Sequence, residues 1–265
     1  MKTAGLAAAL ALALGAAPAL HAAAAREVHQ TLPLDADGTL TIKTFKGSIT
    51  VATGSAAEVR VDARIEPDGD DSDQARKVEE TRVDVSGGGR SVTVRSDYDG
   101  ITRRHRFFWW GHDGTLPFVR YHVTMPKTAR LVIDDYKSDV SVAPLSSELT
   151  LETYKGTVTL RGVEGPARLT TYKGEMRVEV PRLASDLRMS TYKGSYEVML
   201  PADARFTLDA DTGRRGSFES DFAVASVTTS RRFGRDGGRV RGDANGGGPR
   251  LEFDTYKGSL RLRAK

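Results

Sequence analysis

A four-residue phrase that recurs six times constrains the fold of this chain more than any other feature. Its copies place an aromatic residue before a lysine, and five of the six end in glycine; they span residues 44–47, 135–138, 153–156, 171–174, 191–194 and 255–258. The spacing is 18 residues from Lys137 to Lys155, 18 from Lys155 to Lys173 and 20 from Lys173 to Lys193. A fixed period near 20 residues is typical of stacked repeats, in which each copy packs against its neighbours.

Apolar residues flank every copy at the same four offsets. Counted from the lysine, positions −6, −4, +3 and +5 are apolar or aromatic in all six copies, which makes 24 sites. Leu149, Leu151, Val158 and Leu160 are one such set. Alternation with a period of two predicts strands with one buried face. The Tyr-Lys-Gly between them predicts a turn, because glycine adopts the positive φ that tight turns need.

One such unit buries too little apolar surface to offset the ordering of its own backbone. The remaining stabilisation must come from neighbouring units, through backbone ladders and shared apolar contacts. We therefore predict an all-β fold, a single-stranded β-solenoid (β-helix-like) with rungs of about 18–22 residues. One short helix is expected between about Ser72 and Thr81, capped by Asp71 or Ser72, with Ala75, Val78 and Arg82 on one face.

The chain divides into four segments. Residues 1–25 are predicted to be a secretory signal peptide, because a basic start precedes an apolar run and then small residues at 22–25. Residues 26–66 are expected to form the first solenoid rung, and 67–126 an insertion with the short helix, a hairpin and an aromatic-basic loop. Residues 127–265 are expected to form the main β-solenoid repeats. The last repeat would form an exposed end of the stack, protected from edge-to-edge pairing by the charges of Arg261, Arg263 and Lys265.

Composition bounds the location and the partners of the protein. The chain has no cysteine, so it has neither a lipoprotein attachment site nor a disulfide framework. No stretch after the signal approaches the roughly 18 apolar residues of a membrane-spanning helix. The net charge of +4 is mild, so it permits attraction to anionic envelope polymers without requiring it. We predict a periplasmic or secreted protein with no nucleic-acid partner.

The order of these segments resembles a known family. A secretion signal is followed by Lys46-Gly47-Ser48-Ile49-Thr50-Val51 and a variable insertion. Then Tyr121-His122-Val123-Thr124-Met125-Pro126 leads into tandem rungs, and Asn245-Gly246-Gly247-Gly248-Pro249 precedes a terminal rung. This order is similar to that of the bacterial β-strand-repeat "putative adhesin" domains, a family of unknown function. The resemblance covers nearly the whole mature chain and implies a β-helix-like solenoid at the cell envelope, with no catalytic residues to carry over.

An aromatic-basic loop at 103–112 is the strongest candidate binding site. It contains both tryptophans of the chain, and its four consecutive aromatic residues do not match a half-buried strand. Such a loop suits glycan stacking, a lipid-headgroup contact or protein docking. The alternative interpretation is a hydrophobic cap over an open end of the core. The candidate binding residues are Arg103, Arg104, Arg106, Phe107, Phe108, Trp109 and Trp110.

The stacked turns should align aromatic and basic side chains in rows, with a spacing of about 4.8 Å. A row of lysines beside rings suits an anionic glycan. We interpret the rows as mainly structural, because like charges at this spacing repel by only about 1 kcal/mol in water. Asp134, Glu152 and Asp254 are expected to neutralise the lysines. The members are Tyr136, Lys137, Tyr154, Lys155, Tyr172, Lys173, Tyr192, Lys193, Tyr256 and Lys257.

Other polar clusters give weaker signals. The acidic stretch 68–73 lacks the glycine and the distal glutamate of an EF-hand loop and is interpreted as a helix start. The Arg/Gly segment 231–241 is interpreted as a solvated loop. The mature-chain histidines are scattered, without a nucleophile motif, a phosphate loop or zinc spacing; they are His29, His105, His112 and His122.

These observations favour a non-enzymatic protein with no metal and no cofactor. The predicted function is an adhesin-like binding or scaffold module that contacts envelope glycan, lipid headgroups or an envelope protein. The alternative is a polysaccharide-acting β-helix enzyme, which would need acids and bases clustered on one face. The sequence does not define the oligomeric state.

Overall fold

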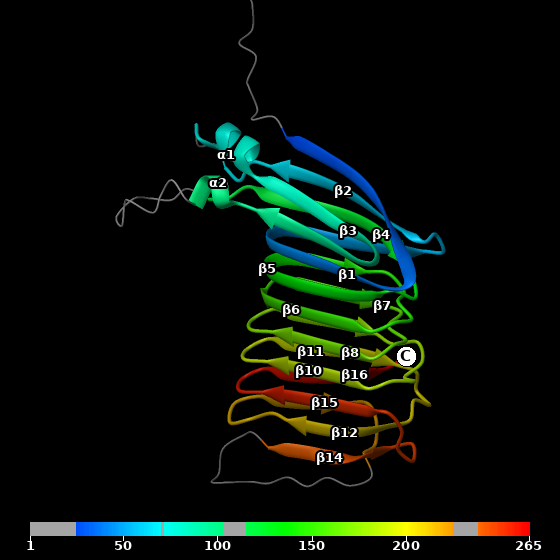
Figure 1. Cartoon of the computed structure of the whole chain (residues 1–265). Coiled ribbons are helices and arrows are strands. Elements are labelled where there is room, and N and C mark those ends of the chain that lie inside the picture. Colours follow the sequence, from blue (N-terminus) through cyan, green and yellow to red (C-terminus); the bar gives the residue numbers. More distant parts are fainter. Residues whose placement is uncertain (1–24, 70–71, 103–114, 225–237) are drawn as a thin grey trace, which may run out of the picture.

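The computed structural model describes residues 25–69, 72–102, 115–224 and 238–265, and this part of the chain is mostly β. Sixteen strands of the described residues form one largely parallel, strongly curled sheet, accompanied by two short helices (Figure 1). No helix within these ranges is both long enough and apolar enough to cross a bilayer. The predicted β class is confirmed. The expected signal peptide falls almost entirely outside the described residues.

Two series of parallel strands pass through the sheet and meet at β5 (Arg130–Val142), which contributes one half to each. The first series continues through β6 (Leu149–Lys155), β8 (Ala167–Thr171), β10 (Leu187–Thr191), β15 (Arg250–Thr255) and β12 (Phe206–Asp211). The second continues through β7 (Thr157–Arg161), β9 (Glu175–Glu179), β11 (Ser195–Leu200), β16 (Ser259–Ala264) and β13 (Ser217–Ser220). Each repeat therefore gives one strand to each series, and we call such a pair a rung.

Successive rungs are in register. Leu131 pairs with Leu149 in the first series, and Val140 pairs with Val158 in the second. Beyond β12, the last strand of the sheet is β14 (Arg239–Ala244), which runs antiparallel to β12. Because the pairing repeats without a shift, equivalent residues of successive repeats lie side by side, as the sequence period predicts.

The N-terminal region adds strands to the same stack. The long first strand bends through both series, so that Leu40 pairs with Leu131 on one side and with Val92 on the other. Part of the segment expected as an insertion, 67–126, therefore supplies a further rung above the first repeat. The elements are β1 (Arg26–Gly54), β2 (Glu58–Glu66), β3 (Arg82–Asp97) and β4 (Phe118–Pro126), with β2 antiparallel to β1 and β4.

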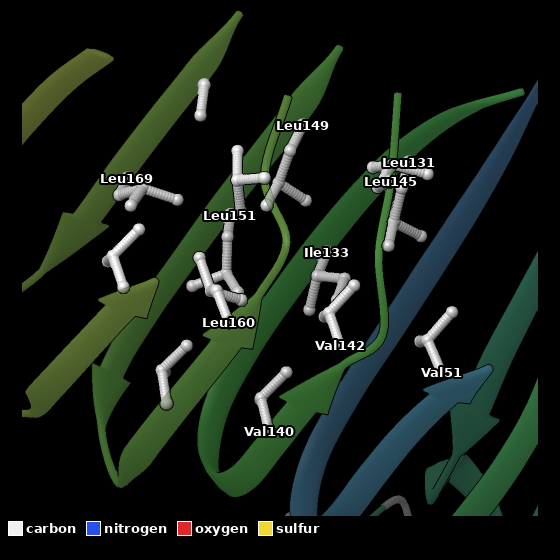
Figure 2. Close-up of a cluster of buried hydrophobic side chains, with 14 of the residues drawn as sticks. Val51, Leu131, Ile133, Val140, Val142, Leu145, Leu149, Leu151, Leu160 and Leu169 are labelled. Atoms are coloured by element: carbon white, nitrogen blue, oxygen red, sulfur yellow. The ribbon is translucent and has the colours of Figure 1, made fainter. Parts of the chain in front are cut away.

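The core lies between the two series. All 24 apolar sites predicted from the repeat are buried. Figure 2 shows part of this cluster, in which Leu149 and Leu151 of β6 pack together with Leu160 of β7. The alternating pattern therefore identified the buried face of each strand correctly.

The spatial order of the rungs differs from their order in the sequence. β15 lies between β10 and β12 (Figure 1). In the second series, β16 lies between β11 and β13. The last repeat is thus inside the stack, and its predicted role as an exposed end is wrong. Its charges serve ion pairs with neighbouring strands instead: Arg261 and Arg263 pair with Glu219, and Lys265 pairs with Glu179.

The structure contains two helices where one was predicted. α1 (Gln74–Glu80) confirms the expected helix, but Asp73 stands at its N-terminus and makes no capping bond with its side chain, so a cap at Ser72 is wrong. Asp71 lies outside the described residues. The buried face of α1 consists of Gln74, Lys77 and Val78, while Ala75 is exposed. α2 (Asp99–Thr102) is a single turn, too short to leave a periodic pattern in the sequence.

Candidate functional site

The corners between the two series stack in register. Backbone N–H groups of one corner donate to carbonyl oxygens of the previous one, from Lys173 to Tyr154 and from Lys193 to Tyr172, each at 2.9 Å. Lys46 pairs with Lys137, which pairs with Lys155. The predicted alignment of the Tyr-Lys corners is therefore confirmed.

In three of the phrases, the threonine that begins the phrase stabilises the corner from inside; these are Thr171, Thr191 and Thr255. The hydroxyl oxygen of Thr171 accepts a hydrogen bond of 2.8 Å from the N–H of Gly174, and Thr191 does the same for Gly194 at 2.6 Å. Both threonines are buried. A side-chain oxygen that accepts from a backbone N–H nearby is a known way to stabilise a turn. This role was not predicted, although the recurring threonine is a signal for it in the sequence.

Glycine is required at these corners for two different reasons. Gly47 and Gly156 adopt positive φ values of 141° and 135°, as expected for a tight turn. Gly174 does not, but a Cβ there would lie 2.7 Å from the carbonyl oxygen of Gly156 in the rung beside it. Close stacking of the backbones, rather than turn geometry, therefore excludes a side chain at Gly174.

The aromatic residues of the six phrases form a continuous stack, which we call the tyrosine ladder. Neighbouring ring centroids lie 4.7–5.2 Å apart and neighbouring ring planes differ by only 3–10°. Tyr98 closes one end with an edge contact to Phe45 at 6.2 Å. The rings, in spatial order, are those of Phe45, Tyr136, Tyr154, Tyr172, Tyr192 and Tyr256.

Each ring covers the face of the next, so the ladder presents mainly ring edges and hydroxyl groups to solvent. The exposed fractions of Tyr136, Tyr172 and Tyr256 are 41%, 39% and 42%. These are high for aromatic side chains on a folded domain, and contiguous exposed apolar surface commonly marks an interaction site. The ladder is thus both a stabilising contact between rungs and an accessible surface.

The lysines lie against the rings. The Nζ atom of Lys173 is 5.3 Å from the ring centroid of Tyr172 and 5.5 Å from that of Tyr154, and Lys193 and Lys257 lie over their own tyrosines at 5.9 and 5.4 Å. These distances allow cation–π attraction. We call Lys137, Lys155, Lys173, Lys193 and Lys257 the lysine row.

The carboxylates expected to neutralise the lysine row do not do so. Within the described ranges, neither Asp134, Glu152 nor Asp254 forms an ion pair with a lysine of the row. Lys46 is the exception among the phrase lysines, since it is buried, pairs with Asp68 and lies 4.3 Å from the ring centroid of Phe118. The lysines of the row therefore do not pair with the carboxylates that stand three residues before them in the sequence.

A groove of about 590 Å³ runs beside the ladder along the first series of strands. Tyrosine rings form one side, and the outward side chains three residues before each lysine form the other. We call it the ladder groove; that second row consists of Asp134, Glu152, Thr170, Ser190 and Asp254.

Asp135 is a buried carboxyl group under this groove. Its Oδ2 accepts hydrogen bonds from the N–H of Ser138 at 2.9 Å and from the hydroxyl of Thr153 at 2.7 Å. Its Oδ1 has no hydrogen-bond partner among the described atoms. Burial raises the pKa of Asp135 above its ordinary value of 3.8, and the hydrogen bonds from Ser138 and Thr153 oppose that shift. Asp135 therefore takes the acceptor position that Thr171 and Thr191 hold in their own corners.

The aromatic-basic loop predicted as the main binding site lies outside the described residues, from Arg103 to Trp110. Arg231, Arg232 and Arg235 of the Arg/Gly segment also lie outside them. Two arginines at the end of that segment, Arg239 and Arg241, bind Asp209 at 2.7 and 3.1 Å. These ion pairs lower the pKa of Asp209 to about 2. These two residues are exposed, as predicted, but they belong to strand β14, so the prediction of a loop is wrong for them.

The described residues do not bring together a metal site or a catalytic group of histidines. No cluster of three or more histidine or carboxylate side chains in those ranges is placed to hold a metal ion. His29 lies 2.7 Å from Asp62 on the surface, and that hydrogen bond raises the pKa of His29. The tyrosine ladder and its groove are therefore the candidate site of this part of the chain.

Comparison with known proteins shows that the chain is similar in fold to a solved structure. No protein-family model and no curated protein matches the chain. A "putative cell adhesion protein" from Clostridium sporogenes ATCC 15579 is similar in structure, with a TM-score of 0.52 and 8% identity, over 91% of this chain and 100% of that one. The predicted resemblance to bacterial adhesin-type proteins is confirmed as a structural similarity at low sequence identity.

Two further solved structures match with lower TM-scores. A "putative adhesin" from Bacteroides fragilis NCTC 9343 has a TM-score of 0.32 and 8% identity, over 89% of this chain and 97% of that one. A "putative adhesin" from Parabacteroides merdae ATCC 43184 has a TM-score of 0.19 and 10% identity, over 89% and 96%. Neither score is high enough to support an argument about this chain.

Proposed function

We propose that this protein is a non-enzymatic, adhesin-like binding module of the cell envelope, built as a single-stranded β-solenoid. The observation that carries the proposal is the exposed tyrosine ladder with its lysine row, which repeats the same chemistry on successive rungs. The fold similarity to a protein described as a cell adhesion protein supports the same class.

A repeating anionic envelope polysaccharide is the proposed partner. Each rung offers one ammonium group and one ring edge, so each contact is weak on its own. A polymer that meets several rungs at once gains affinity from the linked contacts, whereas a small substrate meets only one or two of them. The periodic surface therefore favours a long ligand.

The aromatic-basic loop is proposed as a second contact with envelope glycan, lipid headgroups or an envelope protein. Its arginines and tryptophans are residue types that dominate binding energy at interfaces. Changing Trp109 and Trp110 to alanine should weaken binding to isolated envelope fractions while the unfolding midpoint stays the same.

Binding of the purified protein to isolated cell-envelope fractions tests the lysine row. Changing Lys137, Lys155, Lys173 and Lys193 together to glutamine should reduce the bound fraction at least fivefold, and added salt should do the same to the wild type. The matched control changes Arg60, Arg130, Arg161 and Arg177, which lie outside the row, to glutamine and should bind nearly as the wild type does. Equal binding by both variants would show that the row is not the contact.

The polysaccharide-acting enzyme remains the competing function. To test it, the wild-type protein is incubated with a panel of uronic-acid polymers, and cleavage is measured as the release of reducing ends. We expect none, and sustained turnover would overturn the non-enzymatic assignment.

Export to the periplasm or the medium is also part of the proposal, and mass analysis of the mature N-terminus should find cleavage near residues 22–26.

A further inference from the structure

The wall of the ladder groove has an unusual chemistry, because it is made of ring edges. Stacking at 4.7–5.2 Å covers much of both faces of the inner rings, so a molecule in the groove meets mainly their edges. The edge of an aromatic ring carries partial positive charge and its face partial negative charge. A flat aromatic molecule that turns its own face toward this wall therefore makes several edge-to-face contacts at once.

The lining of the groove is acidic. Of its fifteen residues, four carry carboxyl groups and none is lysine, arginine or histidine. The buried Asp135 is hydrogen-bonded under the floor, so the accessible charges are those of Asp134, Glu152 and Asp254. Asp134 and Glu152 form no ion pair in the part of the chain that the structure describes.

Several cations surround these carboxylates without entering the groove. Lys43 is the register neighbour of Asp134 on β1, and Arg239 interacts with Asp254 from β14. No lysine of the row belongs to the lining of the groove. Arg168 on β8 pairs in register with Thr150, two residues before Glu152, and it lines an adjoining pocket together with Arg239. Asp134 and Glu152 are therefore the carboxylates of the groove that remain available to an added positive charge.

The shape of the groove favours a rod. Five steps of about 4.8 Å make the ladder roughly 24 Å long, and a volume of 590 Å³ is within the range of sites for drug-sized ligands. An extended peptide repeats its side chains every two residues, at roughly 6.6–6.8 Å, so it loses register with rungs 4.8 Å apart. A rigid, planar, rod-shaped molecule has no such side-chain repeat, so it can contact the wall at any position along the ladder.

We propose that the ladder groove is a binding site for elongated, planar aromatic cations, which lie along the stack with one face on the tyrosine edges and their charge near Glu152. This site goes beyond the polymer contact proposed above, because its lining contains no lysine of the row and it selects the opposite charge.

Titration with thioflavin T, a planar cationic dye whose fluorescence rises when its internal rotation is blocked, tests the site. We expect saturable binding to the full-length protein that weakens as salt is added. Congo red, a planar dianionic dye, should bind at least tenfold more weakly at the same salt concentration. Equal affinity for the two dyes, or no saturable thioflavin T signal, would overturn the proposal.

Two sets of variants locate the dye. Asp134→Asn with Glu152→Gln should raise the Kd of thioflavin T roughly two- to fivefold, whereas Glu175→Gln on β9, which removes one negative charge away from the groove, should leave it unchanged. Tyr154→Leu with Tyr172→Leu removes the middle of the wall and should raise the Kd about tenfold. The variants are compared only after circular dichroism and unfolding confirm that they fold. An unchanged Kd in both sets would place the dye elsewhere.

The proposed envelope binding and the proposed groove site can each be contradicted without contradicting the other. The four-lysine variant should lose envelope binding and keep the dye, since its changes lie outside the groove lining. The Asp134/Glu152 variant should lose dye affinity and keep envelope binding. A dye site without envelope binding would contradict only the adhesin-like function, and the reverse would contradict only the groove.

Discussion

Asp135 occupies the position that threonine holds in the other five phrases. It reproduces the acceptor role of that threonine toward the N–H of Ser138, but it brings a second oxygen that finds no partner among the described atoms. A buried polar atom without a hydrogen bond costs free energy. The raised pKa of Asp135 gives the sign of the pH effect. Its contribution to stability is fully present below the ordinary pKa of 3.8 and is lost as pH rises through the raised value.

Replacement of Asp135 by threonine should therefore stabilise the protein at neutral pH. We expect the free energy of unfolding at pH 7 to rise by about 1–2 kcal/mol, because the buried charge and the unpaired oxygen are both removed. The gain should shrink in acid, where the wild-type carboxyl group is neutral. Urea unfolding at pH 7 and pH 4 measures both effects.

Asp134→Thr is the matched control for this change. Asp134 is the exposed neighbour of Asp135 and lies in a row where threonine already occurs, at Thr170. Its replacement should change the free energy of unfolding by less than about 0.5 kcal/mol. A loss of stability in the Asp135 variant at pH 7 would contradict the cost assigned to the carboxylate.

At the scale of elements, the tyrosine ladder ties the rungs together outside the core. Tyr172 has a stacked ring on each side, Tyr154 at 4.9 Å and Tyr192 at 4.8 Å. Ring pairs of this kind contribute roughly 0.5–1.5 kcal/mol each beyond the burial of their area. The stacked rings are therefore expected to stabilise the corner even without a ligand.

Tyr172→Ala should lower the free energy of unfolding by about 1–3 kcal/mol, since both ring contacts are lost. Tyr172→Phe keeps the ring and should be nearly neutral, because the hydroxyl group of Tyr172 makes no hydrogen bond among the described residues. Chemical denaturation of the two variants measures the difference. If alanine and phenylalanine were equally stable, the stacking would contribute nothing.

At the scale of the whole molecule, the last repeat is a middle rung. β15 and β16 pair with earlier strands on both sides, so their removal takes a rung out of the stack instead of shortening it. They also carry fully buried core residues, among them Leu251, Leu260 and Leu262. The C-terminal segment therefore has to be in place before the stack can close.

Deletion of residues 250–265 should abolish cooperative unfolding, because strands β12 and β13 lose their parallel partners and the core opens. Thermal and urea unfolding, followed by circular dichroism, measure this outcome. Addition of a peptide that spans residues 249–265 should restore part of the transition by mass action. A truncated chain that still unfolds cooperatively near the wild-type midpoint would show that the last repeat is dispensable.

The sequence by itself determined the repeat, the buried face of the repeat strands and the register of the corners. Those features follow from local pattern: a period of two sets which side chains point inward, and a fixed spacing sets which corners meet. Candidate residues such as Tyr172 and Lys173 followed from the same spacing. The sequence also indicated the helix at Gln74–Glu80, although not its cap.

Only the tertiary structure decided which rung lies beside which, and therefore where in the stack the last repeat lies. All rungs offer the same kind of strand edge, so an apolar pattern cannot tell a neighbour in sequence from a neighbour in space. The order is instead set by long-range pairing, which places β15 between β10 and β12 and adds β3 and β4 beyond β1. The groove likewise depends on side chains from several rungs meeting on one face, which no single repeat contains.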